Sequence, residues 1–281
     1  MKTAPFFIIG NPRSGTTLLR LMINAHPKAT APPECGFALH LADDFASRSS
    51  YDRKLYRDFA KAVTQSRKFE TWGLTERDIL TLIEEKKPKT YPSLCSSIYF
   101  AYAKKKKKAP KAVGDKNNYY IQHLDRLTSI FPDSKLVFIV RDGRDVACSY
   151  REAMRNKTGS KYKPNLPTQI IDIAKKWSAS CREITSHSKE NTKSIRYEDL
   201  ISSPLPSINS IFELLEIPTT NDPLAYLQEQ DEPEDFMAWK SRVKSAPDLS
   251  RIGRYKSELT TEEIAIFEEE SKAELELFNY M

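Results

Sequence analysis

The feature that most constrains this chain is an apolar strand that leads through a glycine-bounded loop directly into a helix. The strand is predicted over 6–10, the loop is 10–17 (Gly-Asn-Pro-Arg-Ser-Gly-Thr-Thr), and apolar residues then recur at helical spacing. In such a layout backbone N–H groups and a helix N-terminus face an anion. Thr16 stands where nucleoside triphosphatases have lysine, and the basic residue is Arg13. The loop therefore predicts an anionic nucleotide other than ATP or GTP.

Composition places few limits on the function. The 281 residues are 40% hydrophobic and 29% charged, which suits one large α/β domain or two small ones. The net charge of +6 fits an anionic ligand without requiring nucleic acid. The first strand starts almost at Met1, which leaves no room for a signal peptide, and no apolar run reaches the roughly 18 residues of a membrane span. We therefore expect a cytoplasmic protein.

The cysteines and histidines indicate no metal site. The four cysteines are scattered without a C-x-x-C pair, so reduced thiols are expected. The four histidines form no ligand-like pair, and we expect no bound metal.

Strand and helix patterns alternate along the chain, which predicts a mainly parallel sheet covered by helices on both faces. Residues 38–86 are expected to be mostly helical, and in the helix after the loop Arg20 and Asn24 lie away from the apolar face. Two stretches, 156–167 and 231–256, are predicted to be irregular and typical of lids or binding loops. The further predicted strands are 111–116, 135–140 and 194–197, and the further helices are 123–131, 145–155, 170–186 and 203–216.

A second anion-binding motif follows the strand 135–140. Arg141 comes directly after this strand, at the carboxyl edge of the sheet where α/β proteins bind ligands, and Ser149 lies on the next helix within reach of the same oxyanion. Taken alone, Arg141 could instead pair with Asp142 or Asp145. Beside the first loop, the motif predicts a ligand with two separate phosphate-type groups, one of them held by Arg13, whose planar charge grips two oxygens.

Four segments in order resemble the sulfotransferases that use 3′-phosphoadenosine-5′-phosphosulfate (PAPS). Residues 6–19, with Pro-Arg-Ser-Gly-Thr-Thr, resemble their 5′-phosphosulfate loop, and 136–149 resemble their 3′-phosphate motif. Residues 196–200 (Arg-Tyr-Glu-Asp-Leu) and 252–256 (Ile-Gly-Arg-Tyr-Lys) resemble a Tyr-Glu-x-Leu segment and a late nucleotide-closing loop. The resemblance implies a single α/β domain over 1–281 with the fold of a nucleotide kinase.

The resemblance also implies a set of nucleotide contacts. PAPS would be the co-substrate and adenosine 3′,5′-bisphosphate the product, without a metal, because a sulfuryl group bears less charge than a phosphoryl group and cationic side chains can replace Mg²⁺. The region 231–256 would close over the nucleotide, and Trp72 or a nearby aromatic residue is expected to touch the base. The implied nucleotide-binding residues are Arg13, Ser14, Gly15, Thr16, Thr17, Arg141, Ser149, Tyr197 and Arg254.

An acceptor hydroxyl must lose its proton, so a base is needed. The histidine that cytosolic small-molecule members carry in a Lys-Thr-His pattern is absent, because Lys116 is followed by Asn117 and Asn118. The spacing from Arg13 to Glu34 resembles tyrosylprotein and other glutamate-base members, and Glu34 is the predicted base, although a glutamate in a Pro-rich turn can simply be exposed. His40 and His123 are alternative bases.

Lys116 is expected to support the leaving group, unless it is a solvated lysine. The acceptor class stays open among peptide tyrosines, carbohydrates and small alcohols or phenols, with the helical region 38–110 as its expected wall. The lysine run 104–108 is expected to be a solvated loop, and docking of an acidic partner is the alternative. Two other functions are weighed: a small-molecule kinase, which would need the missing lysine, and a nucleotide-binding protein without catalysis.

Overall fold

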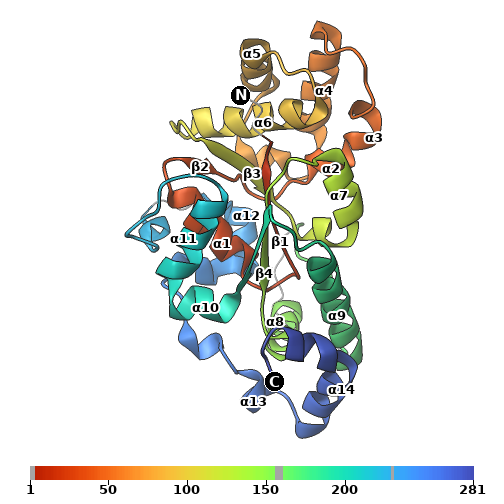
Figure 1. Cartoon of the computed structure of the whole chain (residues 1–281), viewed down its shortest axis with the longest axis vertical. Helices are drawn as coiled ribbons and strands as arrows, with labels where there is room; N and C mark the ends of the chain where they lie inside the picture. Colours follow the sequence, from red (N-terminus) through yellow and green to blue (C-terminus); the bar gives the residue numbers. More distant parts are fainter. Residues whose placement is uncertain (1–3, 156–160, 229–230) are drawn as a thin grey trace.

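A computed structural model describes residues 4–155, 161–228 and 231–281, which surround a sheet of five strands (Figure 1). Every neighbouring pair is parallel, so the carboxyl ends of the strands meet at one edge of the sheet. The predicted single α/β domain with a mainly parallel sheet is confirmed. The strands stand in the order β2-β3-β1-β4-β5, with bounds β1 Phe6–Gly10, β2 Ala29–Thr30, β3 Ala112–Lys116, β4 Leu136–Val140 and β5 Thr192–Arg196.

Helices cover both faces of this sheet, and within the described ranges none is both long and apolar enough to cross a membrane. The α-helices are α1 Thr16–Ala25, α2 Phe37–His40, α3 Ala42–Phe45, α4 Arg53–Gln65, α5 Glu76–Lys86, α6 Tyr91–Lys105, α7 Leu124–Ile130, α8 Gly143–Arg155, α9 Ile170–Ser186, α10 Tyr197–Ser202, α11 Pro204–Leu214, α12 Glu234–Lys240, α13 Tyr255–Glu258 and α14 Thr261–Leu277. The 3₁₀ turns are η1 Phe69–Trp72, η2 Asn118–His123, η3 Ala225–Leu227, η4 Ser241–Lys244 and η5 Leu249–Arg251.

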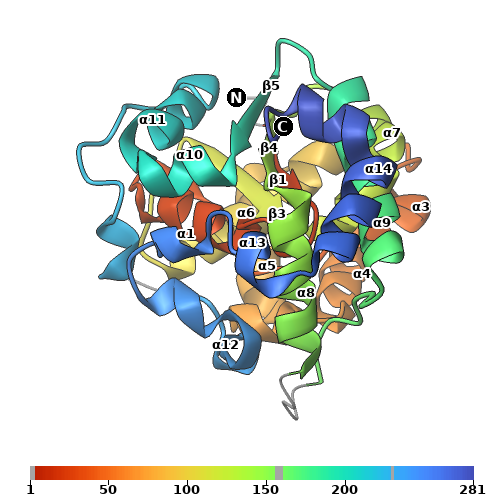
Figure 2. The same ribbon diagram turned by 90° about the horizontal axis from the view of Figure 1, so that it is seen from below.

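The two faces of the sheet are buried in two separate cores. Side chains alternate along a strand, so Phe6 and Ile8 of β1 pack with α1, α10 and α11, whereas Phe7 and Ile9 pack against the other face with α6, α8 and α9. Figure 2 shows α1, α10 and α11 on one side and α7, α9 and α14 on the other. Burial on both faces explains why β1 and β4 are continuous apolar runs.

The loop between β1 and α1 is held by close packing against neighbouring segments. Gly15 has φ +94°, and a Cβ there would lie 2.5 Å from the Tyr197 ring, so only glycine fits. Arg13 also has a positive φ, of 68°, which is costly for a residue with a Cβ. The backbone therefore turns sharply and α1 begins at Thr16.

The region 38–110 is helical, as expected, and it places the loop that carries Glu34. A capping box of Thr75 and Asp78 starts α5. The expectation that Trp72 touches a nucleotide base is wrong, because Trp72 is buried in an aromatic core and its indole N–H donates to the Pro33 carbonyl at 2.8 Å. Trp72 instead fixes the backbone next to Glu34.

Ion pairs with α1 correct the prediction for 231–256. Arg20, which was predicted to lie away from the apolar face of this helix, is fully buried and pairs with Asp231 at 2.8 Å and Glu232 at 2.6 Å. Asn24 donates to Asp231 at 2.6 Å. The stretch 231–256 is not irregular but is folded into α12, η4, η5 and part of α13, because these buried charges attach its start to α1. Residues 156–160 of the other stretch lie outside the described residues.

The lysine run 104–108 is exposed over 104–107, as expected for solvated charges, but Lys108 is partly buried. Its first residues complete α6, and Lys104 pairs with Glu85 at 3.3 Å. The Lys108 ammonium donates to carbonyls of Asn24, His26 and Ala29 just past the end of α1, where a cation stabilises unpaired helix carbonyls.

Candidate active site

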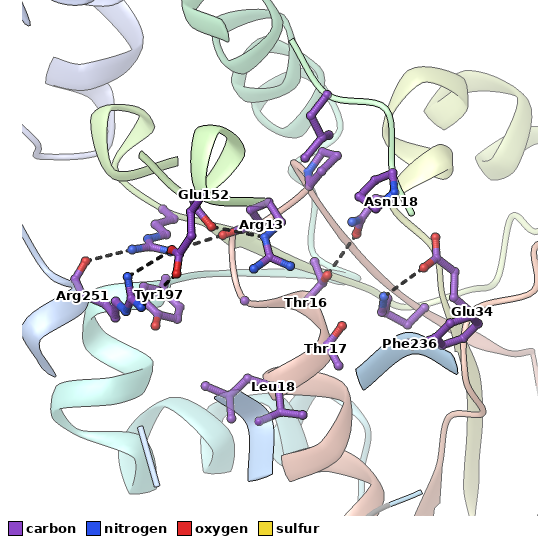
Figure 3. A pocket seen from close by; sticks show the side chains of 18 of the residues that line it. Arg13, Thr16, Thr17, Leu18, Glu34, Asn118, Glu152, Tyr197, Phe236 and Arg251 are labelled. Carbon is purple, nitrogen blue, oxygen red and sulfur yellow. Dashed lines mark hydrogen bonds and ion pairs between the residues drawn. The ribbon is translucent and has the colours of Figure 1, made fainter. Parts of the chain in front are cut away.

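A pocket of about 540 Å³ lies at the carboxyl edge of the sheet (Figure 3). In Figure 3 Glu34 and Phe236 lie at one end, Glu152 and Arg251 at the other, and Arg13 between them. The first, here called the Glu34 end, comprises Glu34, Arg67, Lys68, Tyr162 and Phe236, and the second, the arginine end, comprises Arg141, Ser149, Glu152, Tyr197, Arg251 and Arg254.

Nearly all predicted site residues line this one pocket. The exception is Ser14, whose side chain is completely buried and whose backbone N–H donates to the Asn11 carbonyl at 3.2 Å. The lining residues among those predicted are Arg13, Gly15, Thr16, Thr17, Glu34, Lys116, Arg141, Ser149, Tyr197 and Arg254. Residues separated by up to 241 positions, from Arg13 to Arg254, are therefore brought together. Arg13, Lys116, Arg141 and Tyr197 end or follow neighbouring parallel strands, and Arg254 lies on the segment that Asp145 holds against them.

The loop side chains are joined to the elements that flank them. Arg13 Nε donates to Ser149 Oγ at 3.2 Å, which connects the first anion-binding motif to the second. The Thr16 hydroxyl donates to Asn118 Oδ1 at 3.0 Å, just beyond the end of β3. Asn118 was not predicted, although its position directly after Lys116 and Asn117 is a signal that sequence reasoning can use.

Glu34 lies between two lysines. The ammonium groups of Lys68 and Lys116 are each 3.5 Å from Glu34 Oε2, and Lys116 is almost completely buried. Charges of opposite sign at this distance favour the ionised carboxylate, which is the form that accepts a proton. Lys68 was missed because nothing near 68 in the sequence resembles a motif.

Behind Lys116 lies a second carboxylate, on β3. Asp115 is completely buried, and its oxygens accept hydrogen bonds from the Lys116 backbone N–H at 2.7 Å and from the hydroxyls of Tyr99 and Tyr120. Burial raises the pKa of Asp115 to about 6, although these hydrogen bonds oppose the rise. Asp115 thus fixes the end of the strand that delivers Lys116 to the pocket.

At the arginine end, Arg141 is buried against Tyr197. Its guanidinium carbon lies 4.5 Å from the centre of the Tyr197 ring, and its Nη2 donates to the Arg251 carbonyl at 2.8 Å. The Trp177 indole N–H donates to the Arg141 carbonyl at 2.9 Å, which fixes this turn from the α9 side. Asp145, one of the partners considered for Arg141, lies 4.0 Å from its guanidinium, so the ion pair is weak. Arg141 lines the pocket as well.

The last contributors come from the end of η5 and the segment after it. Arg251 and Arg254 both pair with Glu152 of α8, at 3.3 and 2.9 Å. Arg251 and Glu152 were not predicted, and the basic residues clustered around the Ile-Gly-Arg-Tyr-Lys segment are the signal for the first of them.

The Glu34 end combines aromatic and cationic side chains. The rings of Tyr162 and Phe236 meet edge to face at 5.3 Å, and the cations of Arg67 and Lys68 lie 5.5 and 5.9 Å from the Tyr162 ring centre. These four side chains come from three separate segments, which explains why no sequence motif indicated them.

The alternative bases lie elsewhere. His40 and His123 flank the half-exposed Tyr119 ring, with centroid distances of 4.8 and 4.3 Å, and neither histidine lines the pocket. Among the described residues, no three His, Cys, Asp or Glu side chains are arranged to hold a metal ion. The four cysteines are buried and unpaired.

Comparisons with known proteins agree with this arrangement. A family model described as "Sulfotransferase family" matches residues 5–222. The chain is 25% identical over 222 residues to Protein-tyrosine sulfotransferase A of Caenorhabditis elegans, and the match covers 77% of this chain and 51% of that protein. The chain therefore spans about half the length of this curated relative.

Solved structures with the same fold include two sulfotransferases. The sulfotransferase domain from the curacin biosynthetic pathway matches with a TM-score of 0.60 at 21% identity, over 95% of this chain and 97% of that one. Mouse sulfotransferase SULT7A1, solved with PAP, matches with a TM-score of 0.54 at 13% identity, over 98% of this chain and 86% of that one.

Proposed function

Because this chain belongs to the sulfotransferase family, we propose that it transfers a sulfuryl group from PAPS to a hydroxyl acceptor. The observation that supports this most is the pocket itself, in which a carboxylate flanked by lysines shares a cavity with two arginine-bearing anion motifs. A donor with two anionic groups needs both motifs, and a hydroxyl acceptor needs the carboxylate.

The donor would lie along the pocket from Arg13 to the arginine end. Arg13, the N-terminus of α1 and the hydroxyls of Thr16 and Thr17 would hold the phosphosulfate. Arg141 and Ser149 would hold the 3′-phosphate, with Tyr197 and Arg254 as further nucleotide contacts. The neighbour solved with PAP, the 3′,5′-bisphosphate product of such a donor, supports this choice of nucleotide.

Catalysis would need a base on the acceptor side and a cation on the leaving side. As the acceptor oxygen forms its bond to sulfur, Glu34 would take the hydroxyl proton, and the bond from sulfur to the 5′-phosphate oxygen would break in line with it. Lys116 would offset the charge that develops on that departing oxygen. The 3.5 Å separation of Glu34 and Lys116 allows both groups to reach one reacting centre.

The acceptor remains a peptide tyrosine, a carbohydrate or a small alcohol or phenol. The relative named as a protein-tyrosine sulfotransferase supports the first class. A panel of tyrosine peptides, sugars, lipids and phenols, tested with radiolabelled PAPS, separates the classes by which member becomes labelled.

Binding distinguishes the proposal from its two rivals. Thermal unfolding is followed with adenosine 3′,5′-bisphosphate and, separately, with ATP and Mg²⁺. We expect the bisphosphate to raise the unfolding temperature and ATP to have little effect, since a ligand stabilises the state that binds it. Stabilisation by ATP and Mg²⁺ alone would favour a kinase. Stabilisation by the bisphosphate with no transfer to any panel member would favour a non-catalytic binding protein.

A further inference from the structure

Glu152 places a negative charge among the arginines of the pocket. It lies on α8, one turn after Ser149, and its side chain is 29% exposed toward the cavity it lines. Its oxygens are 3.3 and 3.5 Å from the two terminal nitrogens of Arg251 and 2.9 Å from Arg254 Nη1. Figure 3 shows Glu152 close to Arg251 and Tyr197. One carboxylate therefore occupies guanidinium donors of two arginines at once.

The backbone that carries these arginines is fixed independently of Glu152. The buried carboxylate of Asp145 accepts hydrogen bonds from the backbone N–H groups of Gly253 and Tyr255, at 2.8 and 3.0 Å. Arg141 donates to the Arg251 carbonyl at 2.8 Å. Because Asp145 and Arg141 hold this backbone, Glu152 is not needed to keep the segment in place.

Glu152 also differs from Glu258, the other acid that pairs with Arg254. Glu258 binds Arg254 through two contacts, of 2.6 and 2.7 Å, but it lies outside the pocket lining. The two glutamates thus offer similar partners to the same guanidinium, one inside the cavity and one outside it.

We infer that Glu152 competes with the 3′-phosphate of the nucleotide for Arg251 and Arg254. This inference rests on the proposed function, in which that phosphate lies between Arg141 and Ser149. A phosphate there would share the guanidinium donors that Glu152 occupies and would be repelled by its charge. Glu152 therefore limits how much affinity the 3′-phosphate contributes and speeds release of the bisphosphate product.

The test compares two nucleotides that differ only in the 3′-phosphate. Calorimetric titrations measure the dissociation constants of adenosine 3′,5′-bisphosphate and adenosine 5′-phosphate for wild type and Glu152→Gln. Removing one negative charge near a phosphate is expected to tighten bisphosphate binding roughly tenfold and to leave adenosine 5′-phosphate within about twofold. Stopped-flow displacement should show the gain as slower dissociation of the bisphosphate.

Glu258→Gln is the matched control, because it removes the same charge from the same arginine outside the pocket. Its bisphosphate affinity should stay within about twofold of wild type, because Glu258 is solvent-exposed and does not line the pocket. Thermal unfolding of each variant without nucleotide checks that it is folded.

The outcomes separate this inference from the proposed function. If Glu152→Gln weakens bisphosphate binding or leaves it unchanged, Glu152 does not compete and the inference is wrong. If both nucleotides tighten equally, Glu152 does not act on the 3′-phosphate and the inference is also wrong. If wild type does not bind the bisphosphate at all, the proposed function itself fails.

Discussion

The two ends of the pocket are built differently. At the arginine end the key side chains follow the strands β4 and β5 directly or lie on the helix after β4, and Arg141 and Ser149 are almost completely buried. At the Glu34 end the side chains come from loops and short helices, and Arg67 is exposed. The sheet thus positions most of the proposed nucleotide site, apart from Arg251 and Arg254, whereas segments outside the sheet shape the proposed acceptor site. We therefore expect that acceptor specificity can change without disturbing donor binding.

Two tryptophans make the comparison concrete. The indole N–H of Trp72 donates to the carbonyl of Pro33, next to Glu34, and that of Trp177 donates to the carbonyl of Arg141. Each end of the pocket therefore has one buried ring that positions its central residue from behind.

The largest effect is expected for Glu34→Gln. Loss of the base should lower the transfer rate about 10²- to 10⁴-fold, while the affinity for adenosine 3′,5′-bisphosphate stays near that of wild type. Radiolabel transfer and calorimetry measure the two quantities. Glu85→Gln, an exposed glutamate paired with Lys104, is the control. Full transfer activity in Glu34→Gln would remove Glu34 from the role of base.

Arg141→Met should, in contrast to Glu34→Gln, change nucleotide affinity. The loss of charged hydrogen bonds to a phosphate is expected to weaken bisphosphate binding about 100-fold and adenosine 5′-phosphate much less. Calorimetric titration of both nucleotides measures the difference. Arg182→Met, which removes an exposed arginine on α9, should change neither affinity. Equal weakening for both nucleotides would contradict the place given to the 3′-phosphate.

Asp115, which lies behind Lys116 near the Glu34 end, makes the stability of the protein depend on pH. Its pKa in the folded protein, about 6, lies above its ordinary value of 3.8, so the folded state binds this proton more tightly than the unfolded state. This contribution to stability is present below about pH 4 and is lost as the pH rises to about 6. The free energy of unfolding of wild type should therefore fall relative to that of Asp115→Asn by roughly 2–3 kcal/mol as the pH rises from 4 to 7. Urea unfolding across this range measures the difference, and parallel curves for the two proteins would contradict it.

The smallest effects are expected for the two tryptophans. The same substitution at each end of the pocket tests whether the arginine end and the Glu34 end act separately. Trp72→Phe and Trp177→Phe should each lower the free energy of unfolding by about 1 kcal/mol, as expected for one lost hydrogen bond. Trp72→Phe should then lower turnover without changing nucleotide affinity, and Trp177→Phe should weaken nucleotide binding. The same kinetic change in both variants would show that the two ends are not separate.

The sequence revealed the arginine end better than the Glu34 end, for a physical reason. Arg13 and Arg141 follow apolar strands, and parallel strands bring such residues to one edge whatever the distance between them in the chain. The family match over residues 5–222 confirms the resemblance on which the other nucleotide contacts up to Tyr197 depended, whereas the segment 252–256 with Arg254 lies outside the match. Their roles, like the cytoplasmic location, stay predictions.

What the sequence did not reveal depends on tertiary contacts. Lys68 contacts Glu34 only because η1 packs beside the loop that carries Glu34. Arg20 is buried only because Asp231 and Glu232 pair with it from a distant segment. Trp72 was assigned to the nucleotide because an aromatic residue has the same local signal in a core as in a binding site. Pairings between distant, non-periodic segments leave no pattern that a single sequence can show.

The central claim is that the pocket moves a sulfuryl group rather than a phosphoryl group. The direct measurement supplies the protein with ³⁵S-labelled PAPS and, in parallel, with γ-³²P-labelled ATP and Mg²⁺, against one panel of hydroxyl acceptors. The account predicts that at least one acceptor takes up ³⁵S and that Glu34→Gln abolishes most of this label. Uptake of ³²P without ³⁵S would contradict it.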